Sequence, residues 1–251
     1  MMFASATAFT GLLGAGLLGA LGGLMQASQN KARTQKAEAA IAPVRAALAG
    51  YDVDALAQST ARDSLAGIDW LRERPTTFGK DETPAGMSGV LDKSPADETV
   101  FVRYSYDLSP DFGSLRLIEI IQIADKNPVS AGTDKALKPT DRLSGKHLVY
   151  SRSVVSIVQL PNAVKADLAA NANSWASNGG WIVRGALRKA FASVGQLTPR
   201  TLALTQADVS AMNHSAGQRR MAGEFTGRQI SEENGTRLIW ANQFIAVQPA
   251  W

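Results

Sequence analysis

TVFVRYSYDLSPDFGSLRLIEIIQIA, residues 99–124, is the stretch of this sequence that decides the fold. Apolar and polar side chains alternate along its first half, which is the period of a β-strand with one buried face. The residues that share this face are Val100, Val102, Tyr104 and Tyr106. The motif SPDFG then supplies a turn, because proline and aspartate both favour turn positions. The stretch therefore predicts an antiparallel hairpin.

The second strand of this hairpin is apolar on both faces. Alternation places Leu115, Leu117, Glu119, Ile121 and Ile123 on one face. The opposite face also carries isoleucines, so the middle of the strand forms a continuous apolar run. Such a run is typical of a strand that lies in the interior of a sheet. We therefore expect this strand to be central.

Three further strands follow from similar patterns. Residues 146–160 predict a long strand that ends at Pro161, and residues 218–230 and 236–247 predict a second hairpin. Asn234-Gly235 lies between the two strands of that hairpin and is a strong signal for a tight turn. Residues 73–98 and 125–145 are rich in proline, glycine and polar residues, and they predict long loops, the first of which can contain a short strand near residues 76–78.

Two segments have helical periodicity. Residues 31–72 are rich in alanine, and residues 162–195 carry apolar side chains at spacings of three and four. Glycines within 162–195, at Asn178-Gly179-Gly180, predict a break between two helices.

The sequence therefore predicts an α+β fold. We expect an antiparallel sheet of about five strands, built from two hairpins and a long middle strand, with helices packed on one face and an apolar N-terminal helix before it. The expected organisation is an apolar segment over 1–27, a helical arm over 28–72 and an α+β domain over 73–251.

The N-terminal segment indicates a membrane or an export route, because residues 1–30 contain no charged side chain. A membrane-spanning helix needs about 20 apolar residues, whereas the apolar part of a signal peptide needs roughly 7–15. The run lies between these lengths, so a signal peptide, a retained membrane helix and a buried soluble segment all remain open. Met25-Gln26-Ala27 fits a cleavage site, whereas Lys31, Arg33 and Lys36 favour a cytoplasmic domain after a retained helix.

Small residues recur in this segment at a helical spacing. They are Gly11, Ala15, Gly19 and Gly23. Such a face allows close packing of helices in a membrane and predicts a homo-oligomer. The alternative is that a segment rich in alanine, glycine and leucine produces this spacing by chance.

Composition excludes several classes of site. The chain has no cysteine, which excludes disulfides, thiolate metal sites, a cysteine nucleophile and a lipidated cysteine anchor. The net charge of +4 is small for 251 residues, and acidic residues are interspersed with basic ones. The clusters Arg184, Arg188, Lys189 and Arg219-Arg220 have no adjacent aromatic stacking platform. We therefore expect a solvated basic face and no nucleic-acid partner.

No catalytic or cofactor motif is present. The two histidines, His147 and His214, lack the spacing of a metal site, and neither a nucleophile elbow nor a phosphate-binding loop occurs. The sequence therefore assigns no catalytic, cofactor-binding or metal-binding residue, and we expect no cofactor. A hydrolase-like site that only the folded chain assembles stays open as an alternative.

Two groups of residues are candidates for a ligand or partner surface. Around the predicted helix break lie Trp175, Gly179, Gly180 and Trp181, where glycines allow a close approach to the backbone and a helix N-terminus attracts anions. The alternative is a helix corner with the tryptophans in the core. The second group lies on predicted strands and consists of Tyr104, Tyr106, Tyr150 and Trp240. These residues form an aromatic surface if their face is open, and core if helices cover it.

Together these features predict an exported or membrane-tethered protein of the cell envelope, either periplasmic, secreted or membrane-anchored. Its α+β domain is expected to act as a non-enzymatic binding or structural module for a protein or cell-envelope partner. One alternative is a membrane-inserting or oligomerising component that works through the glycine-spaced helix. The hydrolase-like enzyme is the other.

Overall fold

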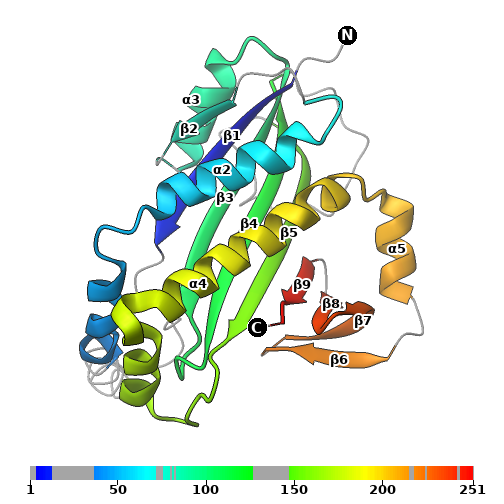
Figure 1. Ribbon diagram of the computed structural model, residues 1–251. Helices are drawn as coiled ribbons and strands as arrows, with labels where there is room; N and C mark the ends of the chain where they lie inside the picture. Colours follow the sequence, from blue (N-terminus) through cyan, green and yellow to red (C-terminus); the bar gives the residue numbers. More distant parts are fainter. Residues whose placement is uncertain are drawn as a thin grey trace, which may run out of the picture.

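The fold is α+β, with one mostly antiparallel sheet and helices on its faces (Figure 1). The sheet has the strand order β2-β1-β3-β4-β5-β9-β8-β7-β6. The structure is a computed structural model, and it describes residues 4–12, 37–71, 76–79, 81, 83–126, 147–214, 218–223, 225–241 and 244–250.

The predicted central hairpin is confirmed. Strands β3 (Glu98–Leu108) and β4 (Ser114–Asp125) pair in antiparallel register, with Tyr104 opposite Glu119. The turn between them is closed by Asp111, whose carboxylate accepts hydrogen bonds from the Ser109 hydroxyl at 2.7 Å and from the Gly113 amide at 3.0 Å. Strand β4 lies between β3 and β5, so its expected interior position is also confirmed.

The second half of the sheet contains more strands than the sequence predicts. After β5 (His147–Gln159) come β6 (Arg219–Ala222), β7 (Phe225–Glu233), β8 (Thr236–Ala241) and β9 (Phe244–Gln248). Each of the two strands expected over 218–230 and 236–247 is thus divided. The pairing is antiparallel from β6 to β9, whereas β9 runs parallel to β5.

Strands β5 to β9 curl back on themselves. Gly223, which directly follows β6, has a φ of +56°, and a Cβ added there would lie 2.6 Å from Cγ2 of Ile157 on β5. This positive φ turns the chain and explains why the expected strand is divided, because glycine adopts such a conformation without steric cost. The curl encloses a small apolar cluster that includes Val155, Ile239 and Ala246.

At the other side of the sheet, the pairing of β1 with β2 and β3 was not expected. The backbone of β1 (Ala4–Leu12) lies between β2 (Thr76–Gly79) and β3 and runs parallel to both. The sequence instead predicts a helix for this apolar stretch. Most of that predicted helix, residues 13–27, lies outside the described residues, so the apolar helix stays a prediction. The short strand expected within 73–98 is confirmed by β2.

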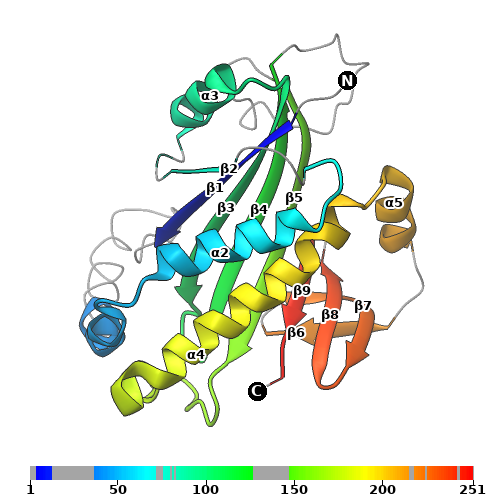
Figure 2. The same cartoon turned by 45° about the horizontal axis from the view of Figure 1, so that its top comes forward.

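The main helices cover one face of the sheet. Helix α2 (Val53–Ala66) and helix α4 (Leu168–Leu202) lie side by side across β3, β4 and β5, as Figure 2 shows. Residues 37–48 form a further helix before α2. The core between these layers contains buried side chains from the sheet and from α4, including Leu117, Trp175 and Phe191. Helices packed on one face agree with the expected architecture.

The opposite face is covered at one end by α3 (Pro84–Lys93), whose Met87 and Leu91 pack on Phe101. The prediction of a long loop over 73–98 is wrong at residues 84–93, which form α3. This helix starts where Thr83 accepts a hydrogen bond from the Gly86 amide and proline occupies the first helical position. The short helix α5 (Gln206–His214) follows α4.

Candidate functional site

A sharp corner divides α4 into a first arm, residues 168–176, and a second arm, residues 181–202. Asn178, Gly179 and Gly180 have positive φ angles of 54°, 66° and 83°. Three successive residues in this left-handed region kink the chain between two helical arms, and residues with a Cβ resist this conformation. The predicted helix break is therefore confirmed, and residues 177–180 are called the α4 corner below.

The α4 corner packs against the end of the helix formed by residues 37–48. A Cβ added to Gly180 would lie 2.8 Å from Cβ of Ala47, so glycine is required there for space as well as for φ. Arg184 in the second arm donates two hydrogen bonds, at 3.0 Å and 2.6 Å, to the carbonyl oxygen of Ala47. Its guanidinium also lies over the ring of Tyr51 at 5.6 Å. These contacts fix the position of the 37–48 helix, since a cation at a helix C-terminus is stabilising.

Trp181 starts the second arm and is 64% exposed. Gly179 is also exposed, and a Cβ added to it would meet nothing within 4 Å. A large exposed apolar side chain beside an open turn is available for contact with another surface. Of the residues expected around the helix break, Gly179 and Trp181 thus reach the surface.

The first arm of α4 is tied to the β3–β4 turn. Trp175 is fully buried, and its indole nitrogen donates a hydrogen bond of 2.7 Å to the carbonyl oxygen of Phe112. The side-chain amide of Asn171 donates one of 2.8 Å to the carbonyl oxygen of Asp111. Trp175 therefore belongs to the core, as the alternative reading predicts, and it is not part of a ligand surface.

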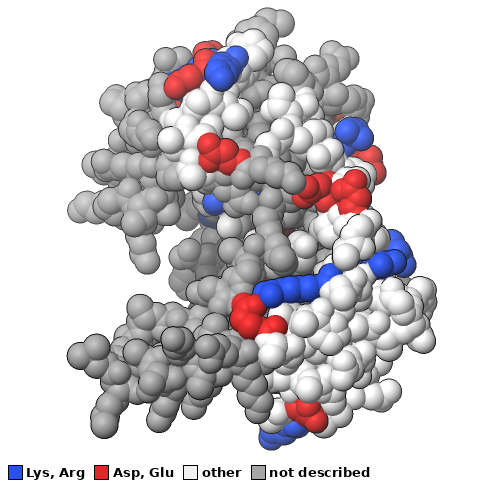
Figure 3. Space-filling model, turned by 90° about the vertical axis from the view of Figure 1, so that its left-hand side faces the viewer, with Lys and Arg blue, Asp and Glu red and all other residues white. Residues whose placement is uncertain are grey.

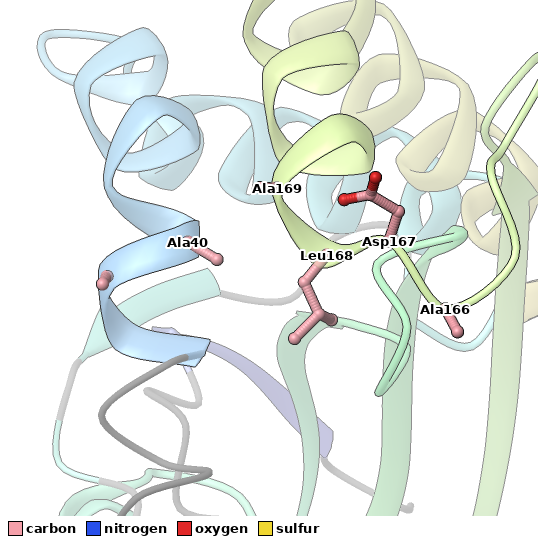
Figure 4. A pocket seen from close by; sticks show the side chains of 6 residues that line it. Ala40, Ala166, Asp167, Leu168 and Ala169 are labelled. Carbon is pink, nitrogen blue, oxygen red and sulfur yellow. The ribbon is translucent and has the colours of Figure 1, made fainter.

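A pocket of about 460 Å³ lies between the 37–48 helix and the start of α4 (Figure 4). Its lining is mostly apolar and consists of Ala39, Ala40, Ala166, Asp167, Leu168 and Ala169. The carboxylate of Asp167 caps α4, because it accepts a hydrogen bond of 2.9 Å from the Ala170 amide. The pocket therefore offers apolar contacts, while its one charged group already serves the helix.

Of the two readings for the aromatic residues on the strands, the structure supports the core and corrects the open surface. Tyr104 and Trp240 are buried, and Tyr106 and Tyr150 are partly buried against the same core. The Tyr150 hydroxyl donates a hydrogen bond to the carbonyl oxygen of Thr201 on α4, and the Trp240 indole donates one to Asn213. Helices cover this face of the sheet, which is the physical reason for the correction.

One buried carboxyl lies in this core. Glu119 on β4 has no exposed surface, and the Thr198 hydroxyl on α4 lies 2.8 Å and 3.0 Å from its two oxygens. Burial raises the pKa of Glu119 to about 8, an effect that its neighbours Thr198 and Tyr104 partly oppose. Burial and the nearby carboxyl also raise the pKa of Tyr104.

A perturbed carboxyl often marks a functional site, but this one is closed from solvent. Glu119, Thr198 and Tyr104 are all buried. A substrate therefore cannot reach the cluster without separation of α4 from the sheet. Sequence reasoning missed this cluster, although alternation already placed Glu119 on the same face as Leu117 and Ile121.

Metal ligation finds no support among the described residues, where no group of three or more histidines and carboxylates could hold an ion. His214 lies on α5, and its Nδ1 is 2.7 Å from the carbonyl oxygen of Ser210. On the described part of the surface shown in Figure 3, acidic and basic side chains are interspersed, with no large area of a single sign.

Comparison of the chain with protein-family models, with curated proteins and with solved structures gives no match.

Proposed function

We propose that this protein is held at a membrane of the cell envelope by its apolar N-terminal segment, and that its α+β domain is a non-enzymatic binding module. The partner is a protein or another envelope component. The observation that carries the proposal is where residues 13–36 leave and rejoin the described fold: the C-terminal end of β1 and the 37–48 helix lie at the same end of the sheet (Figure 1).

The register of β1 defines the first attachment. Leu12, the last residue of β1, pairs with Tyr106, close to the β3–β4 turn. The second attachment is the helix that begins at residue 37, because its Ala39 and Ala40 share a pocket with the start of α4. The start of α4 is bound to the same turn through Asn171. Residues 13–30 between the two attachments contain no charged side chain.

Retention of the N-terminus is part of the proposal. Cleavage after Ala27 would remove β1, which pairs with β2 on one side and with β3 on the other. Strand β2 would then lose the partner that joins it to the sheet. Pairing of β1 thus supports a retained N-terminus over a cleaved signal. No helix among the described residues is long and apolar enough to cross a bilayer.

Fractionation of native cells with intact-mass analysis tests the proposal. We expect the full-length mass in the membrane fraction, and release into the soluble fraction when Leu17→Lys and Leu18→Lys are combined. The matched control, Val149→Lys and Ile230→Lys, adds the same charge at exposed positions of the domain and should stay with the membrane. A full-length wild-type protein in the soluble cytosol would refute the tether, and a mature start near residue 28 would refute retention.

For the alternative of a homo-oligomer, fewer of the four small residues remain candidates for a helix-packing face. The structure places Gly11 in β1, so this residue is not part of a helical face in this conformation. Ala15, Gly19 and Gly23 lie outside the described residues. A homo-oligomer through these small residues stays a prediction.

A further inference from the structure

We infer that one end of the domain rests on the surface of an anionic bilayer, with Trp181 among the lipid head groups. This end is called the corner end and consists of the 37–48 helix, the 161–167 loop and the α4 corner with Trp181. The inference rests on the proposed tether and adds the orientation of the domain and the residues that touch lipid.

The two points where the apolar segment joins the domain indicate that this end faces the bilayer. Leu12 lies near the β3–β4 turn, and the 37–48 helix shares its pocket with Ala166 in the 161–167 loop. A segment that is anchored in a bilayer holds the nearest part of the domain close to the head groups. Because both attachments lie at the corner end, that end is the nearest part.

The side chains at this end fit a membrane surface. Trp181 is 64% exposed and Val164 in the loop is 50% exposed, although both are apolar. Tryptophan prefers the head-group region, since its ring is apolar and its indole N–H still finds a hydrogen-bond partner. Lys165 adjoins Val164 and is exposed. Lys165 favours anionic lipids, and the carboxylate of the nearby Asp167 is engaged in capping α4.

A second exposed tryptophan provides an internal comparison. Trp70 is 45% exposed and follows the C-terminal end of α2. Helix α2 starts beside the α4 corner, where Tyr51 contacts Arg184, and its 14 residues span about 20 Å. Trp70 and Trp181 therefore mark opposite ends of the helical layer, and only the corner end should approach the bilayer.

The test uses the full-length protein reconstituted in vesicles of phosphatidylcholine and phosphatidylglycerol that contain brominated acyl chains. Bromine near a tryptophan quenches its fluorescence, so quenching reports which indole lies in the bilayer. We compare the wild type with Trp181→Phe and with the matched control Trp70→Phe. The remaining tryptophans are common to all three proteins.

The measured quantity is the decrease in tryptophan fluorescence in brominated vesicles relative to unbrominated ones. We expect this decrease to be largely lost in Trp181→Phe and retained in Trp70→Phe. Equal quenching in all three proteins, or its loss in Trp70→Phe alone, would overturn the inference. Flotation of the same vesicles separates the two proposals. Protein that floats without quenching of Trp181 overturns the orientation alone, whereas protein that does not float overturns the tether and the orientation with it.

A charge substitution gives a second readout. Lys165→Glu should weaken flotation with anionic vesicles and leave flotation with pure phosphatidylcholine unchanged, because the lysine acts on lipid charge. The matched control is Lys93→Glu in the last turn of α3, which packs on the other face of the sheet. Equal flotation of both variants with anionic vesicles would contradict a role of Lys165 at the membrane.

Discussion

The hydroxyl oxygen of Thr198 lies 2.8 Å and 3.0 Å from the two carboxyl oxygens of Glu119, and both side chains are buried between α4 and β4. The same hydroxyl is 3.0 Å from the carbonyl oxygen of Val194. A hydroxyl has one proton, so it donates to one of these acceptors at a time. A protonated Glu119 resolves the competition, because its own O–H then donates to Thr198 while Thr198 donates to Val194.

The free energy of unfolding should therefore fall as pH rises. Burial raises the pKa of Glu119 to about 8 in the folded protein, above the value of 4.5 expected for an exposed glutamate. Between these two pKa values the carboxyl is ionised in the unfolded chain but protonated in the folded chain. The free energy of unfolding therefore decreases by at most about 1.4 kcal/mol for each pH unit. Below 4.5 both states are protonated and this contribution is fully present.

Denaturant titrations at pH 5 and pH 8 check this for the wild type and for Glu119→Gln. The amide is neutral at both pH values and keeps the shape of the carboxyl. We expect Glu119→Gln to be less sensitive to pH and more stable than the wild type at pH 8. Parallel pH dependence of the two proteins would show that Glu119 does not titrate in this range.

Thr198→Val should lower the free energy of unfolding by about 1–3 kcal/mol, because it removes the hydroxyl partner of a buried carboxyl. The change nearly preserves the volume of the side chain, so little of the effect arises from packing. Thr198→Ser keeps the hydroxyl and serves as the control, with a smaller loss from the missing methyl group. Thermal unfolding checks this prediction. Equal melting temperatures for Thr198→Val and the wild type would contradict a stabilising role of the hydrogen bond.

Local patterns in the sequence were sufficient to predict the β3–β4 hairpin and the break at Gly179 and Gly180, because alternation and glycine conformation act over a few residues. The partner of Glu119 could not be predicted in this way, since Thr198 is 79 positions away and meets it only through the packing of α4 on the sheet. The pairing of β1 is equally non-local. Its residues carry the apolar composition of a membrane segment, and only the neighbouring strands β2 and β3 give them a strand conformation.

Gly180→Ala should destabilise the protein more than Gly179→Ala. Both residues have a positive φ, so alanine costs about 1 kcal/mol of backbone strain at either position. Only at Gly180 does the added Cβ also collide with Ala47, at 2.8 Å, so the 37–48 helix must shift. Equal melting temperatures for the two variants would show that the contact with Ala47 does not limit the α4 corner.

Trp175→Phe should cost about 1–3 kcal/mol, whereas Trp181→Phe should change stability by less than about 0.5 kcal/mol. Trp175 is fully buried, and its replacement leaves the carbonyl oxygen of Phe112 without its side-chain donor. Trp181 is exposed and has no such role. Denaturant unfolding of both variants checks the difference, and a large loss for Trp181→Phe would mean that this side chain supports the fold itself.

Hydrogen exchange measures whether β1 belongs to the folded protein. In the full-length chain, amides of β2 and of β3 on the side facing β1 should be protected, because β1 pairs with both strands. In a chain that starts at residue 28 these amides should exchange faster, since an edge strand presents unpaired backbone groups to solvent. Amides that join β4 to β5 serve as the control, because neither strand pairs with β1. Identical exchange in the two chains would mean that β3 is already an edge strand, and the apolar segment would then be free to serve as a cleaved signal.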